Sequence, residues 1–467
     1  MLQVSYCQHH GYLVIGSSEN FKLMKHSLIE VTFTHISQPI VHTGLHFSRP
    51  DRLWLFILSI LLLFLFSHPS LAVGFGKSNM LQPYVGYTFT ADDNMIRIRD
   101  NPSPLSLQNP QINAAIEKGN FFDTSHRFMG GAIFEKEISR QRLSANFNWA
   151  HTSFDKFSSM DNNLKNASGN WNWFWGKNFH GNMGATYMQS LSFLLNSSKN
   201  IRTEQTEYIN ATWRPHSKWR LQGDYTRYNL HSSNPGLRFL NRTEDQFVAK
   251  FDYLLPGDNF VGILLRNIRG DFHPPPRFFH DIPDSSYDQK DILARVNWAI
   301  SEKSNLLIKG GWMERNNTSL TVRDFSGFKG RIIYNWQPTE KLGLTLEGWR
   351  ETSARQNFTA SGSLNTGGNV IPYWNITQKV RLEGDFSYET RNFNKLDKNE
   401  LDLANPELSI GRHNTFRNAA MKLIYNPYLG LQLIASAYHT DVSSDGPRGG
   451  FNANGANINL QYTYGKR

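Results

Sequence analysis

The stretch ANINLQYTY (Ala456–Tyr464), close to the C-terminal end, decides the class of fold. Apolar or aromatic residues fill every second position, and asparagine, glutamine and threonine fill the positions between them. A period of two residues is the signature of a β-strand whose two faces meet different surroundings. A strand of this kind with an aromatic residue near the terminus is typical of the last strand of a membrane-spanning β-barrel. Three further residues, Gly465–Arg467, depart from that pattern.

The same alternation returns along the chain from about residue 80 onward. Segments of roughly ten residues are apolar on one face and polar on the other, as in transmembrane strands that face lipid on one side and a lumen on the other. The clearest of these segments are 143–149, 167–175, 219–226, 292–298 and 380–388. The sequence therefore predicts an all-β chain that crosses a bacterial outer membrane as many short amphipathic strands.

A repeat surrounds the predicted short turns. Each copy runs from an aromatic residue through a short polar turn and a basic residue into a new strand, as in Trp213–Trp219 and Trp336–Leu342. Looser copies cover Phe134–Leu143, Trp175–Asn182, Tyr253–Val261, Trp298–Leu306, Trp374–Val380 and Tyr425–Leu431. Aromatic rings favour the membrane interface, where the ring and its polar edge both find partners. The eight turns are therefore expected on the periplasmic side.

These turns give the number of strands. Eight turns join sixteen strands, and one strand before them (about 81–91) and one after them (455–464) raise the expected number to about eighteen, an even number. Both ends of such a barrel lie in the periplasm, and it encloses an aqueous lumen rather than a packed core. The repeat interval of roughly 40 residues also fits a β-propeller blade. A blade needs four strands, however, whereas each unit here contains two long ones.

Composition agrees with a barrel and restricts other classes. Of the 467 residues, 39% are hydrophobic and 13% are aromatic. A helical membrane protein is more apolar, because each span needs about 20 apolar residues, although a soluble β-protein would have a similar composition. The formal net charge of +10 is spread along the chain without a basic run, so nucleic-acid binding is not indicated.

The first 72 residues are predicted to lie outside the mature barrel. The continuous apolar run Leu53–Phe66 is short for a membrane helix and has the length of a signal-peptide core, and small residues place cleavage after Ala72. The leader 1–50 is long for a signal peptide, which indicates a start codon assigned too far upstream; an N-terminal membrane anchor is the alternative. The domain plan is therefore a leader and signal peptide over 1–72 and a β-barrel over 73–467.

Few residues suggest a catalytic or metal-binding site. There is no HExxH helix, P-loop or nucleophile elbow, so no enzyme activity and no cofactor are predicted. Cys7 is the single cysteine and lies upstream of the cleavage site, so the mature chain has no disulfide or cysteine metal site. Asp92-Asp93-Asn94 carries oxygen ligands of the kind that calcium prefers, but a solvated outer-loop turn is the simpler interpretation. His273–Pro276 is interpreted as a stiff loop.

Charged residues on the predicted polar faces are the candidate functional residues. The candidate lumen-lining residues are Arg220, Asp224, Lys250, Asp252, Arg295, Lys309, Arg331, Glu347, Arg381, Glu383 and Asp385. Charged rings that line a pore select by electrostatics. A wall with arginine, lysine and interspersed aromatic rings is suited to an anionic or neutral polysaccharide. The simpler interpretation is that the wall is polar because water fills the lumen.

Several segments together resemble a known family. They are Tyr87–Arg97, Ile138–Leu143 with Phe154 and Phe157, Arg323–Gly327, and Gly330–Thr339 continuing to Leu346 and Trp349-Arg350-Glu351. Over about residues 81–464 the chain resembles the outer-membrane proteins of exopolysaccharide operons linked to exosortase and PEP-CTERM systems, the EpsL type. The resemblance implies a β-barrel that works beside a polysaccharide synthesis and export machine, and it supplies no catalytic residues.

Four functions are therefore weighed. The first is a passive outer-membrane conduit for exopolysaccharide, with membrane lipid, the polymer and periplasmic export components as partners. The second is a general diffusion porin, which needs a constricting loop and segregated charge. The third is a barrel enzyme acting on lipid or polysaccharide, and the fourth is a structural or assembly barrel with a plugged lumen. The sequence favours the first of these.

Overall fold

The computed structural model describes eight stretches of the chain. They are residues 80–102, 109–192, 199–272, 286–319, 324–354, 362–393, 412–446 and 449–465. All of them belong to the larger of two compact units, Ser37–Arg467. The predicted signal peptide, the cleavage site at Ala72 and the loop His273–Pro276 lie outside the described residues.

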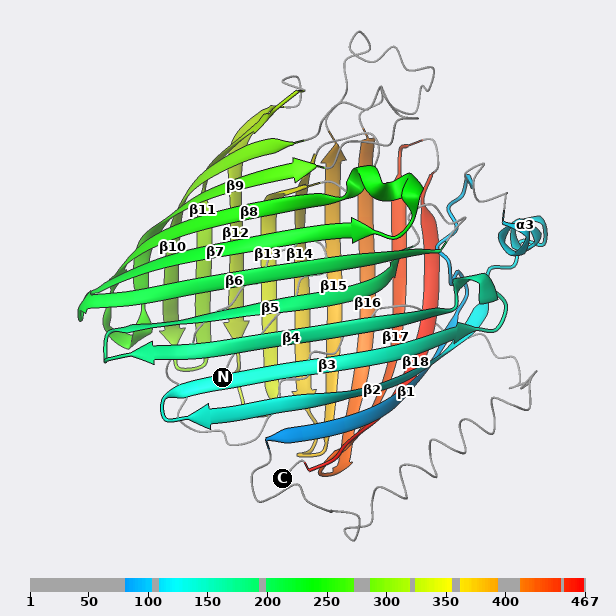
Figure 1. Ribbon diagram of the computed structural model, residues 1–467, viewed down its shortest axis with the longest axis horizontal. Coiled ribbons are helices and arrows are strands. Elements are labelled where there is room, and N and C mark those ends of the chain that lie inside the picture. The colour runs from blue at the N-terminus through cyan, green and yellow to red at the C-terminus, as the bar shows by residue number, and fades with distance from the viewer. Residues whose placement is uncertain are drawn as a thin grey trace. The chain divides into compact units, whose positions relative to one another are not determined.

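The described residues form eighteen antiparallel strands that close into one barrel (Figure 1). Each strand pairs with its neighbours in sequence, and β1 closes the ring against β18 from Tyr84↔Thr463 to Asp92↔Gly455. The strands are β1 (Leu81–Asp92), β2 (Asp123–Ile138), β3 (Gln141–Phe154), β4 (Asn162–Trp175), β5 (Phe179–Ser192), β6 (Asn200–His216), β7 (Trp219–Ser232), β8 (Arg242–Leu254), β9 (Phe260–Phe272), β10 (Tyr287–Ser301), β11 (Ser304–Asn317), β12 (Phe325–Trp336), β13 (Leu342–Ala354), β14 (Gly362–Asn375), β15 (Val380–Phe393), β16 (Arg412–Tyr428), β17 (Leu431–Ser444) and β18 (Phe451–Thr463). The predicted barrel of about eighteen strands is confirmed, and the propeller alternative is wrong.

The connections alternate between short and long. Turns of two to five residues join β2 to β3, β4 to β5 and each following pair up to β16 and β17, at the places of the eight sequence repeats. The strand ends that the longer connections join, the first of them Asp92 and Asp123, lie at the other end of the barrel. Because short turns are periplasmic and long loops extracellular in barrels of this kind, the start of β1 and the end of β18 lie at the periplasmic end.

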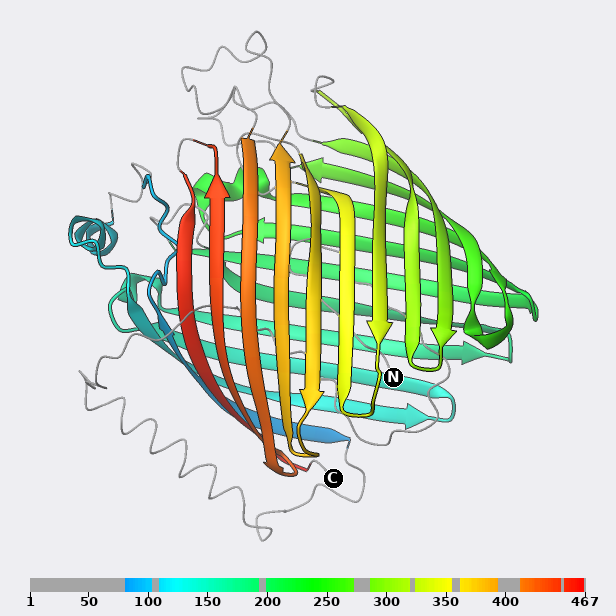
Figure 2. The ribbon, with the colours of Figure 1, turned by 180° about the vertical axis from the view of Figure 1, so that it is seen from behind.

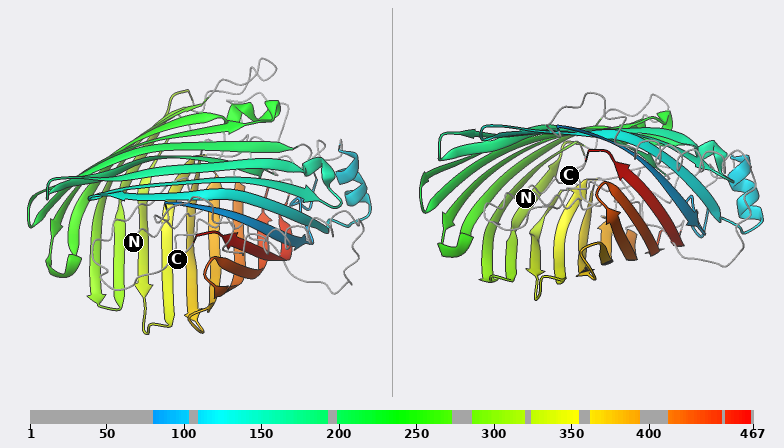
Figure 3. Two further views of the ribbon diagram at one scale, coloured as in Figure 1. Left: turned by 60° about the horizontal axis from the view of Figure 1, so that its bottom comes forward. Right: turned by 90° about the horizontal axis from the view of Figure 1, so that it is seen from below.

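The strands are inclined to the barrel axis. Strands β2–β8 run across the picture in Figure 1, whereas β12–β18 run up the picture in Figure 2. The two walls cross because closing a sheet into a barrel inclines each strand by roughly 35–45° to the axis. Figure 3 follows the wall around to the place where β1 and β18 lie side by side.

Alternate side chains of each strand face outward, and the outward face is apolar. On β10, Ile292 and Trp298 are 62% and 46% exposed, whereas Asp291 and Leu293 are buried on the interior face. The same alternation exposes Phe147, Phe247, Ile263, Phe328, Phe386 and Ile458. So large an apolar surface is unfavourable in water and stable in lipid.

Aromatic side chains gather on the outward face beside the short turns. Exposed examples are Trp175, Trp213, Trp219, Trp298, Trp336, Trp374 and Tyr425. Trp219 stacks on Phe251 of the next strand, with ring centroids 4.8 Å apart. The aromatic residues of the repeat thus form one girdle at the periplasmic edge, where indole and phenol rings prefer to lie.

Interior aromatic rings lie flat on the wall where a neighbouring strand has a glycine. The Tyr208 ring on β6 crosses Gly184 on β5, and its hydroxyl donates a 2.9 Å hydrogen bond to Asn170 Oδ1 on β4. A Cβ atom at Gly184 would stand 2.6 Å from that hydroxyl. The missing side chain therefore gives the ring its place against the wall and keeps it out of the lumen.

A small hydrophobic cluster covers the outer end beside β1–β4. Helix α3 (Pro110–Glu117) begins after Asn109, whose side chain accepts hydrogen bonds from two backbone N–H groups of the first turn. The helix buries Ile112 and Ala115 against residues of the β3–β4 connection, among them Phe157. Among the described helices, none is long and apolar enough to cross a membrane.

The contact between Gly184 and Tyr208 can be tested by adding one methyl group. We expect Gly184→Ala to lower the free energy of unfolding by about 1–3 kcal/mol, the range found for overpacked sites, because the Cβ atom meets the ring and the backbone. The measurement is urea unfolding in lipid vesicles. Gly169→Ala is the matched control on the adjacent strand, since its Cβ would meet nothing within 4 Å. Equal effects of both substitutions would contradict the account.

Candidate functional site

The interior face of the barrel carries the candidate residues. All eleven charged residues singled out from the sequence alternate along their strands with residues of the outward face, so all eleven lie on the interior face. They divide into one group on β7–β13 and a second on β15, joined there by Lys422 of β16. Within each group the structure brings opposite charges together.

Asp252 is the centre of the first group. Its carboxylate, with no exposed surface, lies 2.7 Å from Arg220 on β7 and 3.4 Å from Arg295 on β10. The second contact passes over Gly262 of β9, the residue that lies between Asp252 and Arg295 in the sheet register. A side chain at Gly262 would meet both the carboxylate and the backbone of β8. The glycine therefore lets the Asp252 carboxylate reach an arginine two strands away while it also pairs with Arg220 on the adjacent strand.

Both arginines also contact an aromatic ring. The guanidinium carbons of Arg220 and Arg295 each lie 4.6 Å from the centroid of the Phe260 ring. A buried ring face attracts cations through its quadrupole. Phe260 and Asp252 together hold the two guanidinium groups in place on the wall.

Most of the remaining candidate residues also form ion pairs on the interior wall. Lys250 Nζ lies 2.6 Å from Asp224, and Arg331 lies 3.2 Å from Glu347 and 2.9 Å from Glu351. In the second group, Glu383 bridges Arg381 at 2.6 Å and Lys422 at 2.7 Å, and Asp385 lies close enough to Lys422 to interact with it. The acidic and basic residues of the wall thus neutralise one another in most places.

One place on the wall is an exception. Arg295, Lys309 and Arg331 lie directly opposite one another on β10, β11 and β12. Lys309 makes no hydrogen bond or ion pair with the described part of the chain, and it is repelled by Arg295, Lys250 and Arg266 and attracted by Glu351. Three cations in register on adjacent strands therefore give the wall an excess of positive charge here.

Several interior charges were not singled out from the sequence. Asp291 binds both Arg266 and Lys329, the latter at 3.1 Å. Trp349 of β13 crosses Gly367 and donates a 2.8 Å hydrogen bond from its indole Nε1 to Glu389 on β15. The alternation along each strand places these residues inside, but only the sheet register shows which strands they connect.

The wall opposite the charged groups is lined by amides and phenols. On β3–β6 the interior positions include Asn146, Asn148, Asn166, Asn170, Asn172, Asn182, Tyr208 and Asn210. Tyr84 of β1 joins them, donating to Asn146 at 3.2 Å and accepting from Asn148 at 3.1 Å. This neutral surface offers hydrogen-bond donors and acceptors side by side, and sequence analysis did not single it out.

The acidic segment Asp92-Asp93-Asn94 at the end of β1 is held by the protein itself, and the interpretation of it as a solvated turn is wrong because Asp92 and Asn94 are buried. Asp92 pairs with Arg97 at 2.8 Å, and Asp93 accepts a 3.0 Å hydrogen bond from the backbone N–H of Asn454. Burial by itself lowers the pKa of Arg97, but the Asp92 carboxylate more than offsets it, so the pKa of the guanidinium is above its usual range. No group of three or more potential metal ligands occurs among the described residues. The segment anchors the first outer loop to β18.

These features place the protein in its compartment. The chain forms a closed antiparallel barrel with an even number of strands, an apolar exterior, a girdle of aromatic side chains and alternating short and long connections. These are the properties of a barrel that spans an outer membrane. The chain is an outer-membrane β-barrel protein.

Solved structures similar to this chain share little of its sequence. No family model and no curated protein matches the chain. Among solved structures, OccK2 (OpdF) of Pseudomonas aeruginosa in complex with glucuronate is 9% identical, with a TM-score of 0.42 over 82% of this chain and 98% of that one. A BenF-like porin from Pseudomonas fluorescens Pf-5 is 9% identical, with a TM-score of 0.43 over 83% and 99%. The alcaligin receptor FauA from Bordetella pertussis is 9% identical, with a TM-score of 0.41 over 81% and 76%.

Removing the central carboxylate tests the first charged group. We expect Asp252→Ala to lower the free energy of unfolding by about 3 kcal/mol, because it leaves two largely buried guanidinium groups without their shared partner. Tryptophan fluorescence during urea unfolding in lipid vesicles measures the change. Asp271→Ala, which removes an exposed partner of Arg269, is the control and should change stability by less than about 0.5 kcal/mol. A small effect at both positions would show that the group carries no stability.

Proposed function

We propose that the protein is a passive outer-membrane channel for polar solutes and that it favours anions. The support is the combination of a barrel of eighteen strands, wide enough to enclose an aqueous lumen, and an interior face lined by amides, phenols and paired charges. Solutes would move down their own gradient, so the proposal needs no cofactor and no catalytic residue.

The row Arg295, Lys309 and Arg331 carries the preference for anions. Like charges directly opposite one another on adjacent strands destabilise a sheet, so such a row is expected where its charge is used. Asp252, Glu347 and Glu351 neutralise the two arginines at contact distance, whereas Glu351 acts on the Lys309 ammonium group only from farther away, without an ion pair. That group is therefore the one available to a passing carboxylate, phosphate or sulfate.

Exopolysaccharide export is the second candidate function. It is favoured by the resemblance to outer-membrane proteins of exopolysaccharide operons and by the amide and phenol wall of β1 and β3–β6. Neighbouring donors and acceptors such as Asn170 and Tyr208 suit the hydroxyl groups of a sugar chain. In this candidate the channel is a conduit that receives polymer from periplasmic export components.

Ion selectivity tests the role of Lys309. We expect Lys309→Gln to lower the ratio of anion to cation permeability by up to about fivefold, since a unit charge at about 4 Å in water contributes about 1 kcal/mol. The measurement is the reversal potential of single channels across a KCl gradient. Lys290→Gln removes an exposed lysine from the outward face of β10 and should leave selectivity unchanged. If both variants keep the wild-type ratio, the row does not select.

A deletion strain tests the second candidate. Polysaccharide is assayed in the medium, on the cell surface and in the periplasm. Accumulation in the periplasm with little secretion is the result expected of a polymer conduit. Unchanged secretion would remove this candidate and leave the diffusion channel, whose conductance is measured separately in purified form.

A further inference from the structure

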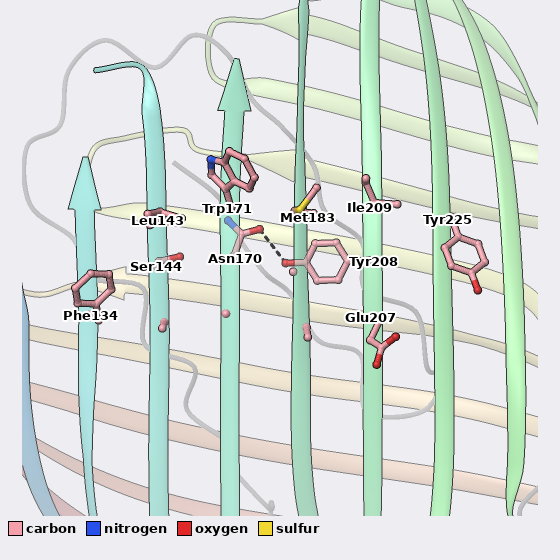
Figure 4. A pocket seen from close by; sticks show the side chains of 14 residues that line it. Phe134, Leu143, Ser144, Asn170, Trp171, Met183, Glu207, Tyr208, Ile209 and Tyr225 are labelled. Atoms are coloured by element: carbon pink, nitrogen blue, oxygen red, sulfur yellow. Dashed lines mark hydrogen bonds between the residues drawn. The ribbon is translucent and has the colours of Figure 1, made fainter. Parts of the chain in front are cut away.

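An apolar groove lies on the lipid-facing side of β3–β6 (Figure 4). Its floor is a row of small residues in direct register, Ala145, Gly169 and Ala185, on β3, β4 and β5. A Cβ atom at Gly169 would meet nothing within 4 Å, so the floor is open. Larger side chains, among them Leu143, Trp171, Met183 and Ile209, rise on both sides of the floor.

The groove ends at a carboxylate. Glu207 of β6 is the next residue in the register after Ala185, is exposed, and makes no hydrogen bond or ion pair with the described residues. It lies six residues above Trp213 of the aromatic girdle, roughly 15 Å along the membrane normal for an inclined strand. The apolar band of such a barrel is about 25 Å tall. Glu207 is therefore inside the band and facing lipid.

A cation lies beside it. Arg227 of β7 is directly opposite Glu207 in the register and is 47% exposed. Its one ion pair in the described part of the chain is long, 3.9 Å to Asp245, and that carboxylate already accepts a 2.7 Å hydrogen bond from Tyr225. The lipid-facing surface thus presents an acidic and a basic group on adjacent strands. Within the described residues Glu207 has no ion pair, and Arg227 has only the long one to Asp245 and an interaction with the Tyr225 hydroxyl.

From this arrangement we infer that the barrel forms a two-fold dimer through β5–β8. The dimer axis runs along the membrane normal between β6 and β7. Glu207 of one copy then meets Arg227 of the other, and the same contact occurs a second time by symmetry. An isologous interface requires such a self-complementary patch, and the adjacent opposite charges of Glu207 and Arg227 provide it.

The shape of the surface agrees with the charges. On the β7–β8 side of the axis, Phe247 is 57% exposed and its ring lies 4.8 Å from that of Tyr225. The ridge formed by Phe247 and Tyr225 and the groove floored by Ala145, Gly169 and Ala185 lie on opposite sides of the axis. Two-fold symmetry therefore places the ridge of each copy over β5 and β6 of the other, against the side of the groove formed by Ala185 and Ile209.

Lipid alone satisfies only part of this surface. An acyl chain can fill the groove, because both are apolar, but it offers no hydrogen bond or ion pair to the Glu207 carboxylate, which is unfavourable in hydrocarbon. A second copy covers the β5 side of the groove and pairs the carboxylate. A monomer with lipid in the groove is the competing outcome of the experiment.

Charge exchange tests the dimer. The wild type is expected to be dimeric by native mass spectrometry in detergent, and Glu207→Arg and Arg227→Glu alone are each expected to shift it to monomer. The double variant Glu207→Arg/Arg227→Glu restores opposite charges across the axis and is expected to restore the dimer. A monomeric wild type, or single variants that dimerise as the wild type does, would overturn the inference.

Cross-linking in the membrane provides a measurement that does not depend on those variants. Ile209→Cys lies beside the axis, and Val370→Cys lies on the outward face of β14, away from the interface. Oxidation is expected to link Ile209→Cys into a covalent dimer and to leave Val370→Cys monomeric. Equal linking of the two variants, or no linking of Ile209→Cys, would overturn the dimer. Channel conductance can be measured on the monomer or the dimer, so it tests the proposed function separately.

Discussion

Closure of the backbone hydrogen-bond ladder between β1 and β18 is the constraint on which the rest of the structure depends. Lipid offers no partner for a free N–H or C=O group, so a sheet can cross a membrane only when it has no edge. The pairing from Tyr84↔Thr463 to Asp92↔Gly455 removes the edge. Once the sheet is closed, each side chain faces either lipid or lumen, and the two-residue period of the strands divides the chemistry between them.

That division explains why the interior can carry so many charges. Only the outward side chains contact lipid. The interior side chains can therefore be charged, and most of these charges form ion pairs with one another. Asp252 pairs with Arg220 on the next strand and with Arg295 across Gly262, and Trp349 reaches Glu389 across Gly367. Lys309 departs from this pairing, and the proposed preference for anions rests on it.

The sequence predicted the fold closely and the site partly. Eight aromatic turns join sixteen strands, and two terminal strands bring the number to eighteen. This number could be predicted because turn residues and apolar–polar alternation are local properties of the sequence. The interior position of residues such as Arg295 follows from the same alternation. Which charges meet depends on register between strands, and the shared contacts of Asp252 and the row through Lys309 are visible only there. The lipid-facing groove ending at Glu207 was not predicted, because it needs small residues from three strands side by side.

The most direct test of the central claim is the sign of the zero-current potential of the purified wild-type channel in a planar bilayer with a KCl gradient. An open channel whose wall carries unpaired positive charge passes chloride more readily than potassium, and the account predicts the sign set by chloride. A channel that prefers potassium, or a barrel that conducts no ions at all, would contradict it.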